Sequence, residues 1–462
     1  MASSPATPSQ AQTAPHSIVL EAVDTGRKIS PLSVGSWALY DFANTIFSLN
    51  IISVYFPAFI IRDLQLNDWV YAYPMSASLL VVALISPLLG AMSDRGGGRR
   101  MPWLIGTTLL CVTMTAVMGL VSNLWLVVAA LILANIGYQT ALVFYDALLP
   151  SVSTTLNWGK VSGIGVGLGY AGALAGGAIV DSIVRGGPNQ AAFLPTAALF
   201  LLFALPCFLF VRERTSLTDD GRRTIDDGSE DTGTSSPSSI VHRPSSAEGP
   251  ASGLTWRGSL TQTWRTIQDI RQVPGLFIFL VANFFYSDAL NTVIVAMGVY
   301  ATQVIGFTSA FQVLAPAIVA AVLGSFLFGF VTDRLTSKQA ITISLLMWVG
   351  VFVAAMLITD KFIFQYVIAT VAGIALGSTW TAARTMMIEL SPREKLGEFM
   401  GIYNLTGKFS AVLGPLLWGT TLVLLDPRQF GQFAYQVAIG TLLLMVLLGF
   451  GLHQLTPNIK RK

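Results

Sequence analysis

Two motifs occur twice in this chain, about 240 residues apart, and both lie in segments too apolar for a soluble domain. The segment Gly90–Arg95 (GAMSDR) returns as Gly329–Arg334 (GFVTDR), each time at the end of a long apolar run. The segment Asp41–Ile46 (DFANTI) returns as Asp288–Val293 (DALNTV), each time inside such a run. These repeats indicate a duplicated membrane protein with two related halves, an architecture that many secondary transporters use.

A third repeat and the composition agree with this interpretation. Gly163–Gly176 aligns without gaps on Gly401–Gly414, and the chain is 53% hydrophobic but only 11% charged. Because a membrane span needs about 20 apolar residues, the sequence predicts an all-α membrane protein with twelve transmembrane helices, six in each half. Their centres lie near Leu49, Leu80, Cys111, Ala134, Ala171, Phe203, Asn283, Ala320, Trp348, Ile374, Ser410 and Leu443.

Cysteine and histidine usage argues against a disulfide framework and a metal centre. The two cysteines, Cys111 and Cys207, both fall inside predicted spans. The three histidines, His16, His242 and His453, fall in a tail, a linker and a helix end. We therefore expect no metal site and no cofactor.

The distribution of Lys and Arg over the connections predicts the orientation, because cationic loops stay on the cytoplasmic side. With the N-terminus inside, most of these residues, including Arg95, Arg100 and Lys160, fall on one side. The opposite side receives only Arg62, Arg185, Lys361 and Arg428. Both termini are thus predicted to be cytoplasmic. The net charge of +3 reflects this orientation and gives no indication of nucleic-acid binding.

Polar segments suggest the domain boundaries. Residues 1–32 are expected to form a disordered N-terminal tail without a cleavable signal. Residues 33–212 and 273–455 form the six-helix halves, and residues 456–462 a basic C-terminal tail. Residues 213–272 are predicted to be a cytoplasmic linker, whose last part forms either an amphipathic helix on the membrane surface or an ordinary solvated helix.

Two six-helix halves joined by a cytoplasmic linker, with a G-x-x-x-D-R loop after the second helix of each half, resemble the major facilitator superfamily over residues 33–455. The resemblance implies that this loop locks the cytoplasmic gate in the outward-facing state. The predicted gating latch consists of Gly90, Asp94, Arg95, Arg99 and Arg100 in the first copy and Gly329, Asp333 and Arg334 in the second.

Charge pairs would hold such a latch, since Asp94 near a helix end can pair with Arg95, Arg99 or Arg100. The sequence leaves the choice of arginine open. The alternative interpretation is that these residues only follow the distribution of charge across the membrane and have no role in gating.

A narrower resemblance lies inside the helices. The strings Trp37–Asn44 (WALYDFAN), Phe144–Pro150 (FYDALLP) and Gly401–Pro415 resemble the autophagy-related vacuolar amino-acid effluxer family and its bacterial relatives, the "unknown major facilitator" group. This resemblance implies a multi-pass transporter whose fungal members export amino acids from the vacuole. It implies the vacuolar membrane for a fungal protein and the plasma membrane for a bacterial one.

Several charges lie at membrane depth. A charged side chain there costs at least about 2.5 to 3.5 kcal/mol on insertion scales, and the chain places Asp41, Asp288, Arg384 and Lys408 within or near this depth. Such groups must face a partner or a water-filled cavity. In the facilitator arrangement, Asp41, Asp146, Asp288 and Arg384 lie on helices that line the central cavity.

The types of these residues suit a zwitterionic solute. Asp and Asn three residues apart share a helical face in both halves and can hold an ammonium group, while Arg or Lys can hold a carboxylate. The alternative is internal salt bridging that only stabilises helix packing. The candidate substrate-binding and proton-coupling residues are Asp41, Asn44, Tyr40, Asp288, Asn291, Arg384, Lys408, Asp146, Tyr145 and Tyr286.

The sequence therefore predicts a secondary active transporter that moves a small polar or zwitterionic solute by alternating access. It has no G-x-x-x-x-G-K-[ST] phosphate loop and no nucleophile–base pair, so we expect neither ATP use nor an enzyme. Its partners are a small solute, the bilayer and, if transport is coupled, protons, with Asp41 as the expected coupling residue. We expect a monomer. Two alternatives stay open, a lipid or amphiphile flippase on the same fold and a non-transporting membrane receptor or scaffold.

Overall fold

The computed structural model describes residues 17–20, 29–67, 69–95, 99–213, 270, 273, 275–308 and 311–461. Most of the predicted linker, including its expected amphipathic helix, lies outside these residues. At Arg95 and Lys408 the backbone is described and the side chain is not.

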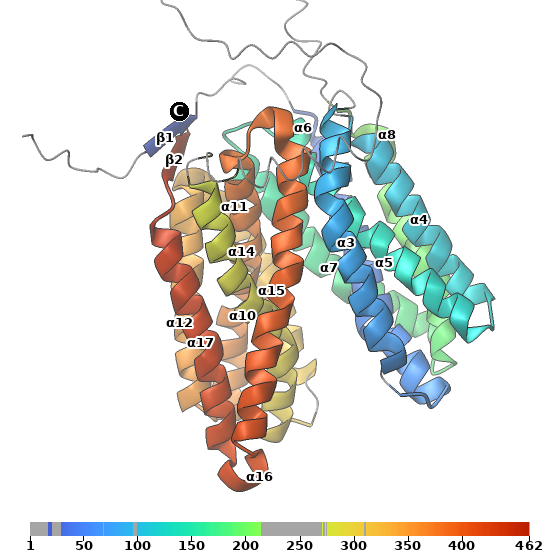
Figure 1. The fold of residues 1–462 in the computed structure, drawn as a ribbon, viewed down its shortest axis with the longest axis vertical. Helices are drawn as coiled ribbons and strands as arrows, with labels where there is room; N and C mark the ends of the chain where they lie inside the picture. The colour runs from blue at the N-terminus through green and yellow to red at the C-terminus, as the bar shows by residue number, and fades with distance from the viewer. Residues whose placement is uncertain are drawn as a thin grey trace, which may run out of the picture.

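The N-terminal half is a bundle of long apolar helices (Figure 1). Its first span starts as α1 (Pro31–Phe47) and continues through a π-helical stretch, η1 (Ser48–Tyr55), α2 (Phe56–Ala58) and η2 (Phe59–Asp63). The other helices are α3 (Trp69–Arg95), α4 (Met101–Leu120), α5 (Leu124–Ala147), α6 (Leu149–Val152), α7 (Trp158–Val184), η3 (Asn189–Ala192) and α8 (Phe193–Phe210).

The C-terminal half repeats this arrangement (Figure 1). Its elements are α10 (Leu276–Gln303), α11 (Phe311–Arg334), α12 (Ser337–Leu357), α13 (Lys361–Ile363), η5 (Phe364–Ile368), α14 (Ala369–Leu390), η6 (Arg393–Lys395), α15 (Leu396–Leu424), α16 (Pro427–Phe430) and α17 (Gln432–Gln454). Among the described residues, 11 helices are long and apolar enough to cross a membrane. The all-α membrane fold is thus confirmed.

The remaining predicted span lies in α15, a helix of 29 residues. Its apolar part within the described residues is shorter and runs from Leu413 to Leu424. This stretch begins directly after Ala411 and Val412, whose side chains, like that of Lys408, lie outside the described part of the chain.

Helix boundaries follow from local sequence. The side chain of Asn123 accepts hydrogen bonds from the N–H groups of Trp125 and Leu126 and so caps α5. Thr336 caps α12 in the same way through the N–H of Gln339. Pro31 occupies the first turn of α1, where its missing N–H removes no helical hydrogen bond.

Both terminal segments contribute a strand. Ser17–Leu20 (β1) pairs in parallel with Asn458–Arg461 (β2), with Ser17 opposite Asn458. The sequence analysis expected no regular structure in residues 1–32, so this strand differs from that expectation. Ile18 and Val19 are β-branched and favour an extended chain, and Figure 1 shows the pair beyond the end of α17.

The two halves touch at one end of the bundle, along α3 with α15 and along α7 with α11. Glycines allow this contact: a Cβ atom at Gly90 would lie 2.2 Å from the carbonyl oxygen of Gly397, and one at Gly163 would lie 2.3 Å from that of Ser325. We call this end, which carries Asp94 and Asp333, the latch end. The Lys and Arg distribution predicts that it is cytoplasmic. Toward the opposite end the halves diverge (Figure 1).

A Gly90→Ala substitution tests this close contact. The added methyl group has no space against the backbone of Gly397, so we expect the halves to separate at the latch end. The measurement is thiol labelling of a Ser162→Cys reporter, because Ser162 is buried and its hydroxyl donates across the halves to the carbonyl oxygen of Thr381 at 3.0 Å.

Gly350→Ala is the matched control, since a Cβ atom at this helical glycine meets nothing within 4 Å. We expect faster labelling in Gly90→Ala and the parent rate in Gly350→Ala. Equal rates in both variants would contradict a contact that requires glycine.

Candidate substrate site and latch

Arg384 of α14 lies between two carboxylates of the other half. Its Nε atom is 3.0 Å from an oxygen of Asp146 at the end of α5, and a terminal nitrogen is 3.5 Å from Asp41 of α1. The three side chains are only 8 to 12% exposed. The sequence analysis placed these residues on helices able to face one another, and the structure brings them together. We call them the central cluster.

Aromatic rings form one wall of the central cluster. The rings of Trp37 and Tyr145 are stacked, with centroids 4.5 Å apart and an interplanar angle of 9°. The Arg384 guanidinium carbon lies 5.8 Å from the Trp37 ring centroid and 5.4 Å from that of Tyr145. The Trp37 indole N–H donates to the carbonyl oxygen of Tyr145 at 3.2 Å. Cation–π attraction therefore adds to the ion pairs that hold Arg384.

The charges of the central cluster do not balance when both acids are ionised. Among the described side chains, one guanidinium faces the two carboxylates of Asp41 and Asp146, which leaves one negative charge in excess. In a setting of low dielectric such an excess attracts a cation or a proton. The cluster can thus offer a cation to a carboxylate and an acid to an ammonium group.

Asp288, the counterpart of Asp41 in the second half, lies elsewhere. It is fully buried, and its Oδ2 atom accepts a hydrogen bond at 2.7 Å from the backbone N–H of Gly414 in α15. Its Oδ1 atom has no hydrogen-bond partner among the described residues. Glycine is needed here because a Cβ atom at position 414 would lie 2.1 Å from the hydroxyl oxygen of Thr292.

Other candidates face the interior of their own half. The Tyr40 hydroxyl bonds to that of Thr108 on α4 at 2.6 Å. Tyr286 packs against α17, where a Cβ atom at Gly449 would lie 3.0 Å from the Tyr286 backbone nitrogen. Asn44 is buried and Asn291 half-buried. The side chain of Lys408 lies outside the described part of the chain.

In the first copy of the latch, Asp94 bridges the two halves. Its carboxylate accepts from the backbone N–H groups of Gly397 at 3.1 Å and Glu398 at 2.9 Å, and it pairs with Arg100 at 2.9 Å. The N–H groups at the start of a helix have no partner within it and carry the positive end of its dipole. Lys395, at the N-cap of α15, supplies no side-chain cap, so Asp94 supplies it from the other half.

The second copy mirrors the first with the halves exchanged. Asp333, near the end of α11, accepts from the backbone N–H groups of Gly159 at 2.7 Å and Lys160 at 2.9 Å, at the start of α7. No side chain caps α7 at Asn157. A Cβ atom at Gly329 would lie 2.9 Å from the carbonyl oxygen of Gly159.

The arginines contribute unequally. Among the arginines whose side chains are described, Arg100 pairs with Asp94. Arg99 and Arg334 are exposed, and the side chain of Arg95 lies outside the described residues. Arg100 also comes within 3.5 Å of the carbonyl oxygen of Ala147, the residue that follows Asp146. Arg100 thus places the latch next to the end of α5, which also carries Asp146 of the central cluster.

Sequence reasoning missed the backbone partners of the latch. Gly159 and Gly397 are separated by the same interval as the repeated pair Gly163 and Gly401. Extending that repeat by one helical turn toward the N-terminus would have found them. Sequence reasoning also missed Glu213, which accepts hydrogen bonds from the N–H groups of Arg100 and Met101. Burial raises the pKa of the Glu213 carboxyl, while these N–H groups and the nearby arginines lower it.

Comparison with known proteins decides the family. A family model described as "Vacuole effluxer Atg22 like" matches residues 68–159 and 153–453. The chain belongs to the Atg22-like vacuole effluxer family. It is 26% identical over 422 residues to the MFS-type transporter YxiO of Bacillus subtilis, covering 86% of this chain and 90% of YxiO. It is also 26% identical over 286 residues to autophagy-related protein 22-1 of Aspergillus niger, covering 56% of this chain and 42% of that protein.

Solved structures show that this Atg22-like protein has the major facilitator fold. The human organic anion transporter MFSD10 (TETRAN) matches with a TM-score of 0.66 and 15% identity, and the match covers 92% of this chain and 100% of MFSD10. FucP in the outward conformation matches with a TM-score of 0.62 and 13% identity, over 91% and 98%. The Atg22-like protein is a multi-pass membrane transporter, and its relatives are transporters rather than enzymes.

An Asp94→Ala substitution tests the latch. It removes two charge-assisted hydrogen bonds between the halves and an ion pair within the N-terminal half; such hydrogen bonds contribute about 1.5 to 3 kcal/mol each. We expect the population open at the latch end to rise by on the order of tenfold or more, measured as labelling of the Ser162→Cys reporter.

Asp360→Ala is the matched control, because Asp360 caps its own segment through the N–H of Ile363 at 2.9 Å and makes no contact across the halves. Asp333→Ala should behave like Asp94→Ala. If neither latch variant labels faster than Asp360→Ala, the two aspartates do not hold the gate.

Proposed function

We propose that this Atg22-like protein is a secondary active transporter for a small zwitterionic solute such as an amino acid. The observation that carries the proposal is the position of Arg384, a cation from one half held between the acids Asp41 and Asp146 of the other. The carboxylate of a zwitterion can replace an aspartate as the partner of Arg384, while its ammonium group replaces Arg384 as the partner of that aspartate.

The chemistry of binding follows from the donors. The Arg384 guanidinium can hold the solute carboxylate through two parallel N–H bonds. The acid that Arg384 releases, together with the surplus acid, then accepts the solute ammonium group. Neither charge is left unpaired, which matters because an unpaired buried charge is strongly destabilising.

Alternating access fits the position of the cluster between the halves. The ion pairs of Arg384 and the two aspartate caps join the halves only while the latch end is closed. A solute that takes over Arg384 removes one of these attachments, and Arg100 relays the change because it contacts both Asp94 and Ala147. Binding can therefore shift the balance between the state that is closed at the latch end and the state that is open there.

We further propose that transport is coupled to protons, with Asp41 as the proton-binding residue and Asp288 as its weaker counterpart. The excess of acids over cations in the central cluster supports a proton on one of them. Asp288 is fully buried in the second half.

The two alternatives have less support. A scaffold has no need of buried charges between its halves. A lipid flippase requires an apolar lateral opening as well as a path for a charged headgroup. The central cluster, in contrast, favours a compact zwitterion.

An Arg384→Lys substitution tests the solute site. It keeps the charge and removes the planar fork, so we expect ligand affinity to fall on the order of 10- to 100-fold while the protein still folds. The measurement is a thermal-shift screen of the common L-amino acids on purified protein, followed by titration of those that raise Tm.

Arg428→Lys, an exposed arginine of α16, is the matched control and should leave every affinity unchanged. Full affinity of Arg384→Ala for each ligand found would overturn the assignment.

An Asp41→Asn substitution tests the coupling. It imitates the protonated acid and leaves Asp146 to hold Arg384 at 3.0 Å. We expect loss of solute accumulation driven by a pH gradient in proteoliposomes, with exchange of internal for external solute retained.

Asp288→Asn and Asp146→Asn serve as comparisons. Accumulation at the parent rate in Asp41→Asn would move the role to one of these residues. The same result in all three variants would indicate a uniporter.

A further inference from the structure

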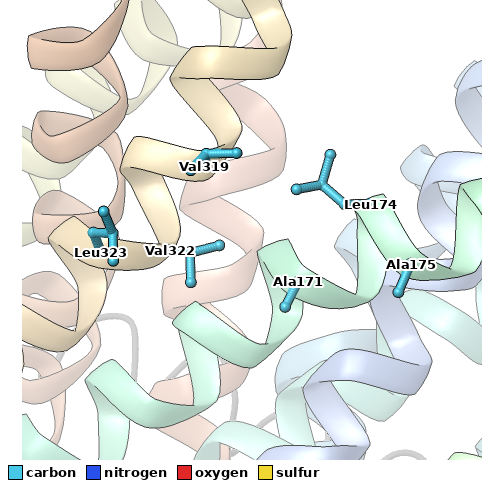
Figure 2. Close-up of a pocket in the computed structure, with 6 residues that line it drawn as sticks. All are labelled: Ala171, Leu174, Ala175, Val319, Val322 and Leu323. Carbon is cyan, nitrogen blue, oxygen red and sulfur yellow. The ribbon is translucent and has the colours of Figure 1, made fainter.

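An apolar groove separates α7 and α11, the two helices that join the halves on one side. Its volume is about 460 Å³, and aliphatic side chains alone line it: Ala171, Leu174 and Ala175 from α7 and Val319, Val322 and Leu323 from α11. Figure 2 shows Leu174 and Val319 reaching into the gap between the two helices from opposite sides.

The groove begins where the close packing of these helices stops. Toward the latch end, a Cβ atom at Gly163 would lie 2.3 Å from the carbonyl oxygen of Ser325, and one at Gly167 would lie 2.9 Å from the Phe326 ring. One helical turn further along, Ala171 and Val322 already line open space. The groove is therefore a wedge between diverging halves, with its closed end at Gly167 and Phe326.

The surroundings of the groove are those of a bilayer interior. Its lining residues all lie within the membrane-spanning segments Trp158–Val184 and Gln312–Arg334. Val319 and Leu323 are 50% and 64% exposed. The same face of α11 stays exposed beyond the closed end of the groove, at Leu327 and Phe330, where the two halves are in contact. This face therefore points out of the bundle, where the medium at this depth is lipid hydrocarbon.

Water is a poor occupant of such a groove. An ordered water needs two to four polar partners, and no side chain that lines the groove carries a polar atom. The backbone N–H and C=O groups of both helices are used within the helices. A hydrocarbon chain, in contrast, gives up no hydrogen bonds when it enters the groove, and it gains dispersion contacts with branched side chains on both walls.

We propose that the groove between α7 and α11 binds one acyl chain of a bilayer lipid, wedged between the two halves. The proposal is independent of the identity of the transported solute, because it concerns a site on the lipid-facing side of the bundle. Since the groove lies between the halves, its width depends on their relative orientation.

Quenching by brominated lipid tests this proposal. An Ala175→Cys variant is labelled with a small fluorophore and reconstituted into phosphatidylcholine vesicles that contain a rising fraction of lipid brominated on its acyl chains. The native Cys111 and Cys207 are both buried and give the background labelling. Leu84→Cys on α3 is the matched control, because Leu84 is 68% exposed on an open helix face.

The shape of the quenching curve distinguishes a single bound chain from ordinary contact with the membrane. A fluorophore with n lipid neighbours escapes quenching with a probability that falls as the n-th power of the unbrominated fraction. We expect n of about one in the groove and a clearly larger n at Leu84. A Val322→Cys variant on the opposite wall should give the same value of n. Agreement between the two positions excludes a local disturbance at position 175 as the cause of the result.

Two results would overturn the proposal. Equal values of n at Ala175, Val322 and Leu84 would mean that the groove is ordinary membrane-facing surface. Quenching by aqueous iodide, with no effect of brominated lipid, would mean that the groove is filled with water.

Discussion

One guanidinium at membrane depth, that of Arg384, links the two halves of this transporter. Arg384 cannot stay charged there without carboxylate partners, because an unpaired buried charge costs several kcal/mol. Its own half does not supply them: the partners Asp41 and Asp146 come from α1 and α5. The electrostatic requirement of one side chain therefore contributes to the contact between the two halves.

The latch solves a related problem with backbone groups. Helices α7 and α15 both begin at the latch end without a side-chain cap, and each receives an aspartate from the opposite half. Close glycine contacts bring the backbones near enough for this exchange. Arg100 adds an ion pair to the first cap. Because Arg100 also approaches Ala147, the state of the latch and the state of the central cluster are physically linked.

Much of the fold and part of the site could be predicted from the sequence. Spans are visible because lipid requires long apolar runs, and the duplication is visible as repeated motifs. Asp41, Asp146, Asp288 and Arg384 were expected on helices that face one another; the structure brings three of them together, whereas Asp288 bonds to the backbone of Gly414. Tyr40 was expected near the cavity, but its hydroxyl bonds to that of Thr108 in its own half. Sequence spacing fixes which residues share a helix face, but it does not fix how the helix is rotated against its neighbours.

The sequence by itself determined the class of protein, its two related halves, its family and the need to pair each charge at membrane depth. These follow from composition and local pattern, which the bilayer constrains strongly. Only the tertiary structure decided which charges meet, that the aspartates of the latch bind backbone N–H groups, and where the halves leave an apolar groove. Every residue carries a backbone N–H, so such a partner leaves no mark in the sequence. The groove likewise depends on the angle between helices far apart in the chain, which arises only when both halves pack.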